Sequence, residues 1–130
     1  MPIQLSTPTR NRHRDAYLAA FPAGSLLQIR SGAPAGVANV AGGTLLAEIT
    51  LPTTPFTSGT GQVALNGTWQ DGSANATGNA GHYRLVNGTD IEEGTVTGTG
   101  GGGDMTLDNV SIAAAQVVTV TGWTRAMPGA

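Results

Sequence analysis

The sequence lacks cysteine and lysine and has few charged or aromatic residues. Of its 130 residues none is cysteine, all six basic residues are arginines, 11% are charged and 5% are aromatic. Without cysteine there are no disulfides and no thiolate metal sites, so core packing, backbone pairing or oligomerisation must hold the fold. The net charge of −2 and the missing lysine argue against a nucleic-acid partner, because phosphate binding depends on clustered basic side chains.

Long apolar runs are also missing. The first residues lack the apolar stretch of a signal peptide, and no segment approaches the roughly 20 apolar residues that a membrane span needs. We therefore expect a chain that is made in the cytoplasm, remains soluble and has no membrane partner.

The residues that are abundant favour β-structure. The 20 glycines, together with many threonines, valines and alanines, suit short strands joined by tight turns, and the length fits one domain with one core. Residues 52–61 are expected to form a loop that Phe56 holds to the core. The pattern predicts an all-β, single-domain antiparallel β-sandwich or jelly roll over residues 25–130, with strands at 25–30, 44–51, 62–69, 81–86, 93–97, 104–107 and 116–123.

Residues 1–24 are expected to form a separate N-terminal segment. Pro2 and Pro8 predict an extended arm over residues 1–9, because proline removes a backbone donor and disfavours helix in the residue before it. A short helix is predicted from residue 10 to residue 21, ended by Pro22 and Gly24. Its apolar residues recur at helical spacing: Ala16, Tyr17, Ala20 and Phe21.

Turn signals and strand periodicity place several side chains. Asn66-Gly67 and Asn87-Gly88 are typical of tight turns. Between residues 81 and 86, a strand would direct Tyr83 and Leu85 to one face and His82 and Arg84 to the other. With so few aromatic residues in the chain, Trp69, Trp123 and Tyr83 are expected in the core; exposed on a surface, they could instead stack on sugars.

Motifs that could support catalysis or cofactor binding are weak. Gly98-x-Gly100-x-x-Gly103 fits a dinucleotide pattern formally, but Asp104–Leu107 reads as a strand and not as the helix that such a motif needs. We therefore expect a flexible hairpin connection and no cofactor. Glu92 and Glu93 are adjacent and would point to opposite strand faces, so they cannot act as a facing acid–base pair. We expect no catalytic residues and no enzymatic activity.

Metal binding is also not expected. Asp104, Asp108 and Asn109 are oxygen ligands close together in the sequence, but their spacing matches no known calcium loop, and the alternative is a turn in which Asp108-Asn109 bonds its own backbone. Two histidines without any cysteine make a zinc site improbable.

The side chains expected to bind a partner are basic. Arg10, Arg12 and Arg14 form a cluster on the predicted helix, and His82 with Arg84 would share one exposed strand face. We expect these five residues to contact a partner protein or a neighbouring subunit.

The second half of the chain resembles small virion proteins of tailed bacteriophages and prophages. The resemblance spans about residues 69–124 and rests on four segments: Ala76-Thr77-Gly78-x-Ala80-Gly81-His82-Tyr83-Arg84-Leu85, Glu93-Gly94-Thr95-Val96, Gly102-Gly103-Asp104-Met105-Thr106-Leu107-Asp108-Asn109, and Ile112 with Val117-Val118-Thr119-Val120-Thr121.

This resemblance implies a structural protein of the phage particle. The function expected first is that of a capsid decoration (cement) protein, which binds the major capsid protein on the head exterior and stabilises the head, as a homo-oligomer with a trimer favoured. The alternatives are a neck component and a tail fibre or spike component, the latter with a host-receptor or carbohydrate-binding role.

Overall fold

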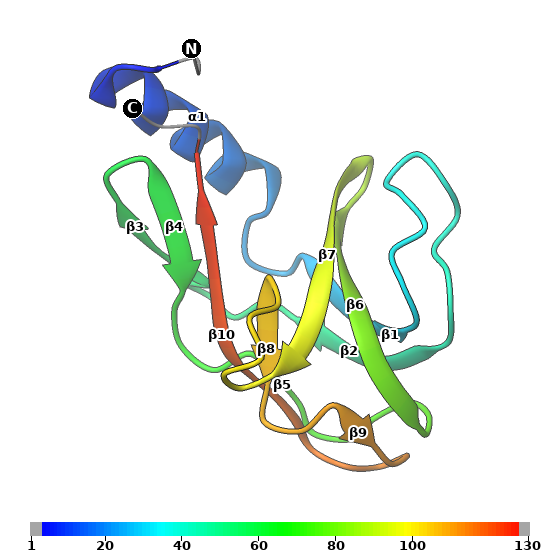
Figure 1. Cartoon of the computed structure of the whole chain (residues 1–130). Coiled ribbons are helices and arrows are strands. Elements are labelled where there is room, and N and C mark those ends of the chain that lie inside the picture. The colour runs from blue at the N-terminus through cyan, green and yellow to red at the C-terminus, as the bar shows by residue number, and fades with distance from the viewer. Residues whose placement is uncertain (1–3, 128–130) are drawn as a thin grey trace.

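The computed structural model describes residues 4–127, in which one helix precedes a single curled β-sheet (Figure 1). The prediction of a β-rich domain with a short N-terminal helix is confirmed. The elements are α1 (Thr7–Ala20), β1 (Leu26–Ser31), β2 (Leu45–Thr50), β3 (Phe56–Gly59), β4 (Gln62–Leu65), β5 (Gln70–Asp71), β6 (Gly78–Asn87), β7 (Asp90–Gly98), β8 (Met105–Leu107), β9 (Ser111–Ile112) and β10 (Val118–Ala126).

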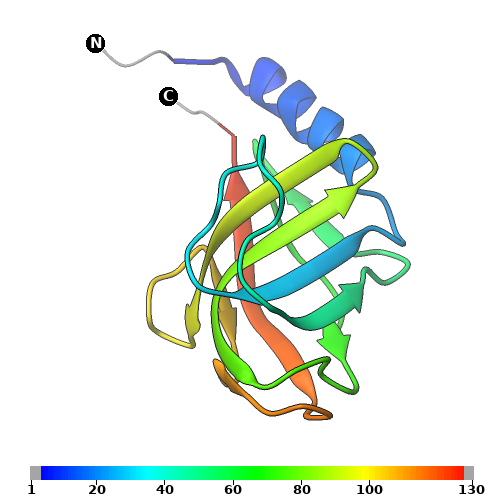
Figure 2. The ribbon, with the colours of Figure 1, turned by 90° about the vertical axis from the view of Figure 1, so that its right-hand side faces the viewer.

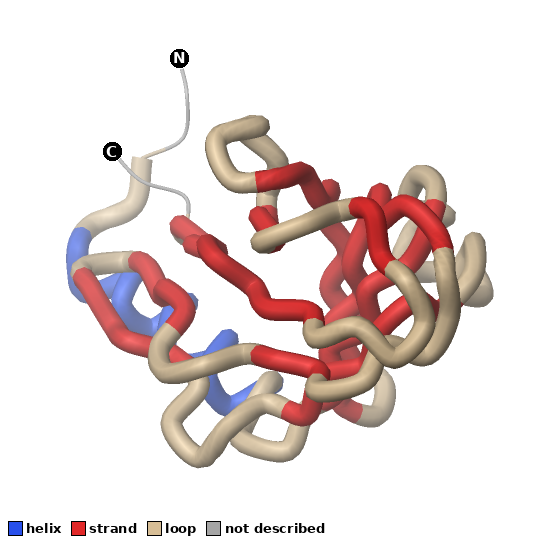
Figure 3. Tube along the Cα trace, turned by 90° about the horizontal axis from the view of Figure 1, so that it is seen from below, coloured by secondary structure: helices blue, strands red, loops and turns tan. Residues whose placement is uncertain are grey.

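The strands form one mixed sheet in the order β2-β1-β6-β7-β8-β10-β4-β3, with β5 paired to β10 and β9 paired to β6. The sheet curls far enough that β5 lies against β2, where the Glu48 amide donates to the Asp71 carboxylate at 3.0 Å. Seen from below, the strands curve around a shared interior (Figure 3). The arrangement is therefore a curled mixed sheet and not clearly the antiparallel sandwich or jelly roll that the strand spacing favours.

The interior of the curl is built around the chain's six aromatic residues. Tyr17, Phe21, Phe56, Trp69 and Trp123 pack with ring centroids 5.1 to 6.0 Å apart. The sixth, Tyr83, joins them because the Trp123 indole donates to its hydroxyl at 3.1 Å. Phe56, Trp69, Tyr83 and Trp123 are all buried, which confirms their predicted place in the core. Aromatic pairs in these geometries add stability beyond the area that they bury.

The helix covers one end of the curled sheet, as Figure 2 shows. It begins at Thr7, where the Ser6 hydroxyl accepts from the Thr9 amide at 3.5 Å. Pro8 lies in the first helical turn, where its missing N–H would have had no partner in the helix. The predicted extended arm is therefore wrong for residues 7–9, and its residues 1–3 lie outside the described part of the chain.

The glycine-rich connection after β7 is not the hairpin that we expected. β8 runs parallel to β7, with Val96 beside Met105 and Gly98 beside Leu107. A parallel partner usually needs a crossover of a dozen or more residues, but here residues 99–104 suffice. Gly100 and Gly102 have φ angles of 84° and 83°, which glycine adopts without strain. A Cβ at residue 101 or 103 would lie within 2.7 to 2.9 Å of the Thr97 side chain, so this compact return depends on glycine.

Other predicted boundaries hold in part. The Asn87-Gly88 turn joins β6 to β7, and Asn87 pairs with Asp90 across it. The strand predicted over residues 62–69 ends at Leu65, and the predicted loop 52–61 contains β3. β3 exists because it pairs with β4, a neighbour that local periodicity does not reveal.

Candidate functional site

A long loop covers the outer face of the sheet and is joined to that face by a network of polar contacts. Residues 32–44, here called the covering loop, connect β1 to β2 and lie across β6 (Figure 2). Beneath the loop, Arg84 lies between Gln28 of β1 and Glu93 of β7, and His82 lies between Arg30 and Thr95. Directly paired residues of antiparallel strands share a face, so this outer face is polar while the inner face carries the core.

The Arg84–Glu93 ion pair fastens the loop to the sheet. The Arg84 Nε donates to Glu93 at 2.9 Å, and the two side chains are 7% and 4% exposed. The Arg84 Nη2 donates to the carbonyls of Gly36 and Asn39 at 3.0 Å each, and the Gly36 amide donates to Glu93 at 2.8 Å. Charged partners make hydrogen bonds about twice as strong as neutral ones. The ion pair and the loop backbone therefore satisfy one another's polar groups.

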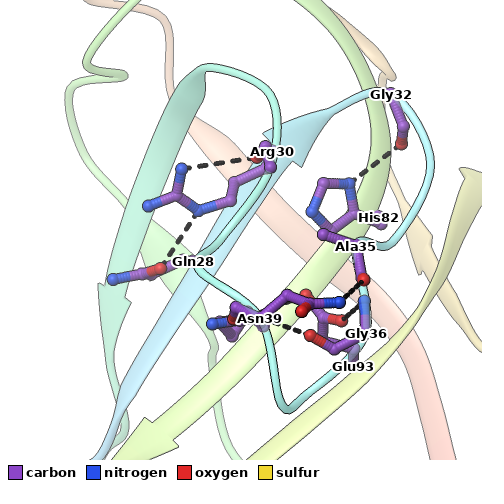
Figure 4. A network of polar contacts seen from close by, with 10 residues as sticks. Gln28, Arg30, Gly32, Ala35, Gly36, Asn39, His82 and Glu93 are labelled. Carbon is purple, nitrogen blue, oxygen red and sulfur yellow. Dashed lines mark hydrogen bonds and ion pairs between the residues drawn. The ribbon is translucent and has the colours of Figure 1, made fainter.

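His82 anchors the start of the covering loop, as Figure 4 shows. Its side chain is fully buried, and its Nδ1 lies 2.9 Å from the Gly32 carbonyl. A carbonyl only accepts, so Nδ1 carries the proton of this bond. The Nε2 has no hydrogen-bond partner in the described part of the chain. Gly81, the neighbouring residue, lies so close to the loop that a Cβ there would stand 2.3 Å from the Gly32 carbonyl oxygen.

These positions correct one expectation. His82 and Arg84 do lie on the opposite face from Tyr83 and Leu85, as the alternation predicts, but the prediction of an exposed face is wrong because the covering loop buries both. The sequence contains a signal for the pairing of Arg84 with Glu93. The Asn87-Gly88 turn fixes the register of the hairpin, and counting back from it brings Arg84 opposite Glu93.

The outward side of the covering loop is exposed and partly apolar. Val40 is 90% exposed and Val37 is 52% exposed. Val117, which is 45% exposed, lies in the segment between β9 and β10, at the opposite end of the view in Figure 1. Single exposed apolar residues need no explanation, but here two lie on one loop whose backbone is fixed by a buried ion pair. Loops held by a rigid scaffold are frequent binding elements.

The three arginines of the predicted cluster on the helix have different surroundings. Arg14 donates to the Gly59 carbonyl at 2.8 Å and pairs with Asp15 at 3.0 Å. Arg10 packs at the same hairpin, because a Cβ at Gly61 would stand 2.8 Å from its guanidinium. Arg12 is exposed. Of the three predicted partner-binding arginines, Arg14 bonds to the β3–β4 hairpin, Arg10 packs against it, and Arg12 is exposed.

A second polar group lies between β7, β10 and the helix. Glu92 accepts from the Tyr83 hydroxyl at 2.8 Å and from the Arg125 Nε at 3.1 Å. Burial, with the Glu92 carboxylate adding to it, raises the pKa of Tyr83 far above its usual range, and the same two causes raise the pKa of Tyr17. Both tyrosines therefore stay neutral hydrogen-bonding groups, which suits a structural role and not proton transfer near neutral pH.

The residues considered for metal and cofactor binding have backbone partners. Asp104 accepts from the Thr95 amide at 2.9 Å, and Asp108 accepts from the Asn109 amide at 2.9 Å, which confirms the predicted turn. Within residues 4–127 no group of three or more histidine or acidic side chains is arranged to hold a metal ion. The glycine motif leads into β8, a strand, as predicted. In the same range no helix combines the length and the apolar character that crossing a bilayer requires.

Comparison of the chain with protein-family models, with curated proteins and with solved structures finds no match.

Proposed function

We propose that this chain is a structural protein of a tailed-phage particle, specifically a capsid decoration protein that binds the major capsid protein on the head exterior. The resemblance of residues 69–124 to small virion proteins is one support. The observation that carries the proposal is the covering loop, which the buried Arg84–Glu93 pair fixes to a stiff sheet so that Val40 faces outward.

A fixed loop is suited to lattice binding because little conformational entropy is lost when it docks. Each copy then contributes a small apolar contact, and contacts repeated by an oligomer on one lattice act at high effective concentration. A homotrimer agrees with this scheme, since three loops would meet the lattice together. The buried positions of Trp69, Trp123 and Tyr83 remove the aromatic surface on which a carbohydrate-binding role depended.

The copy number in purified particles tests the proposal. Quantitative mass spectrometry should find the chain in numbers comparable to the major capsid protein. A handful of copies per particle would instead assign the chain to the neck or tail.

A matched pair of variants tests the role of the loop. Val40→Ser should reduce the amount of protein retained on particles, because it removes apolar area from the contact. Val117→Ser changes an exposed valine in a different loop and should leave retention unchanged. Equal retention of the two variants would contradict docking through the covering loop.

A further inference from the structure

Within residues 4–127, one strand position of the sheet is unfilled. β8 has three residues, whereas its neighbours β7 and β10 have nine each. β8 pairs with β7 from Val96 onward and with β10 as far as Trp123. Beyond the N-terminal end of β8, residues 90–94 of β7 and 124–126 of β10 therefore face each other without a strand between them. Here this vacancy is called the β7–β10 slot.

The slot is open as well as unpaired. A pocket of about 320 Å³ occupies it, lined by Tyr83, Glu92, Glu93, Asp104, Thr124, Arg125 and Ala126. A second pocket of about 350 Å³ adjoins it toward the helix and shares Glu92, Glu93 and Arg125 with the first. β8 already sits between the same two strands, so the gap continues the line of an existing strand position. The main-chain groups along both edges are those that an added strand would pair with.

The lining has a net negative charge. Glu92, Glu93 and Asp104 line the first pocket and Asp90 lines the second. Arg125 pairs with Glu92 and Arg84 pairs with Glu93, which leaves Asp90 and Asp104 without a basic partner in the described part of the chain. Arg125 holds Glu92 from a position that is 50% exposed, while Glu92 is 14% exposed. Asp90 and Asp104 are exposed, so an incoming basic side chain could reach these two carboxylates from solvent. Complementary charge raises the association rate of such a partner and favours it over partners without basic residues.

We propose that the β7–β10 slot binds an extended segment of another protein that carries arginine or lysine, by adding it to the sheet as a strand between β7 and β10. The segment continues the line of β8, pairs with the free edges and places a basic side chain beside Asp90 or Asp104. This site lies beside the covering loop, whose Val37 lines the second pocket, and the proposal does not depend on where the protein acts.

The experiment is an NMR titration of the full chain. The probe is a blocked peptide in which threonine and valine alternate and the central residues are arginine. Amide signals of residues 90–95 and 124–126 should shift together, and binding should be about tenfold tighter than for the same peptide with glutamate in place of arginine. A third peptide, N-methylated at alternate residues, should not bind because it cannot pair along an edge.

A pair of variants adds a control. Asp90→Asn should weaken binding of the arginine peptide, whereas Asp15→Asn, which neutralises an exposed carboxylate on the helix, should not. Equal affinity for the arginine and glutamate peptides would overturn the proposal, as would shifts confined to other surfaces or no shift at all. The last result would mean that the inward-pointing Glu92 serves to protect a free edge from pairing. Slot signals that change with protein concentration in the absence of peptide would also overturn it, by assigning the slot to a second copy of this chain.

Discussion

Glu93→Gln is the substitution that tests the covering loop most sharply. Glu93 is 4% exposed and Arg84 is 7% exposed, so the change leaves a buried guanidinium without its counter-charge. Removing one partner of a buried pair costs about 3–5 kcal/mol. Glutamine keeps an acceptor, and Arg84 keeps the two loop carbonyls, so the low end, about 3 kcal/mol, is expected.

This loss is large enough to measure by heat or by urea. An unfolding entropy of about 2.1 cal/mol/K per residue gives about 0.27 kcal/mol/K for 130 residues, so about 3 kcal/mol lowers Tm by about 11 °C. Fluorescence of Trp69 and Trp123, both buried, reports the transition. Hydrogen exchange of the Gly36 amide reports the loop, and it should accelerate because this amide donates to Glu93.

Two further variants show whether the loss of stability comes from the unpaired buried charge. Asp15→Asn breaks an ion pair whose carboxylate is 63% exposed and should change stability by less than about 1 kcal/mol. Replacing Arg84 by Met together with Glu93 by Leu should recover most of the lost stability while the Gly36 amide still exchanges fast. If Glu93→Gln costs less than about 1 kcal/mol and exchange is unchanged, the ion pair does not hold the loop.

Three other outcomes follow from the contacts. Above about pH 10 the unfolded chain loses the protons of Tyr17 and Tyr83, whereas the folded chain keeps them. The free energy of unfolding should therefore fall by about 1.4 kcal/mol per pH unit for each tyrosine. Tyrosinate absorbance that appears before unfolding would refute this. Gly81→Ala should cost about 1–3 kcal/mol in urea unfolding because its Cβ meets the covering loop, with Gly72→Ala, which meets nothing, as the control. Thr97→Val should lower the free energy of unfolding by about 1 kcal/mol, because the Gly103 amide loses its acceptor. Thr97→Ser keeps the hydroxyl and should keep the stability.

The sequence predicts the parts of the fold that depend on local chemistry. Alternation identifies β6 and its two faces, and Asn87-Gly88 marks the turn that sets its register with β7. Composition alone places the tryptophans inside. The predicted helix starts three residues late because proline disfavours helix in the residue before it, although proline also fits a first helical turn.

The parts that the sequence does not predict depend on partners distant along the chain. Nothing local to β8 indicates that it would pair in parallel with β7, since that follows from how the glycine loop folds back on Thr97. The burial of His82 and Arg84 depends on a loop about 50 residues earlier. The slot between β7 and β10 is likewise a property of the whole sheet.

Photo-cross-linking from position 40 in assembled particles tests the central claim most directly. A photoreactive amino acid in place of Val40 should cross-link to the major capsid protein, and the same group in place of Val117 should not. Cross-links from position 117 alone, or none from position 40 in particles that retain the protein, would contradict an attachment made by the covering loop.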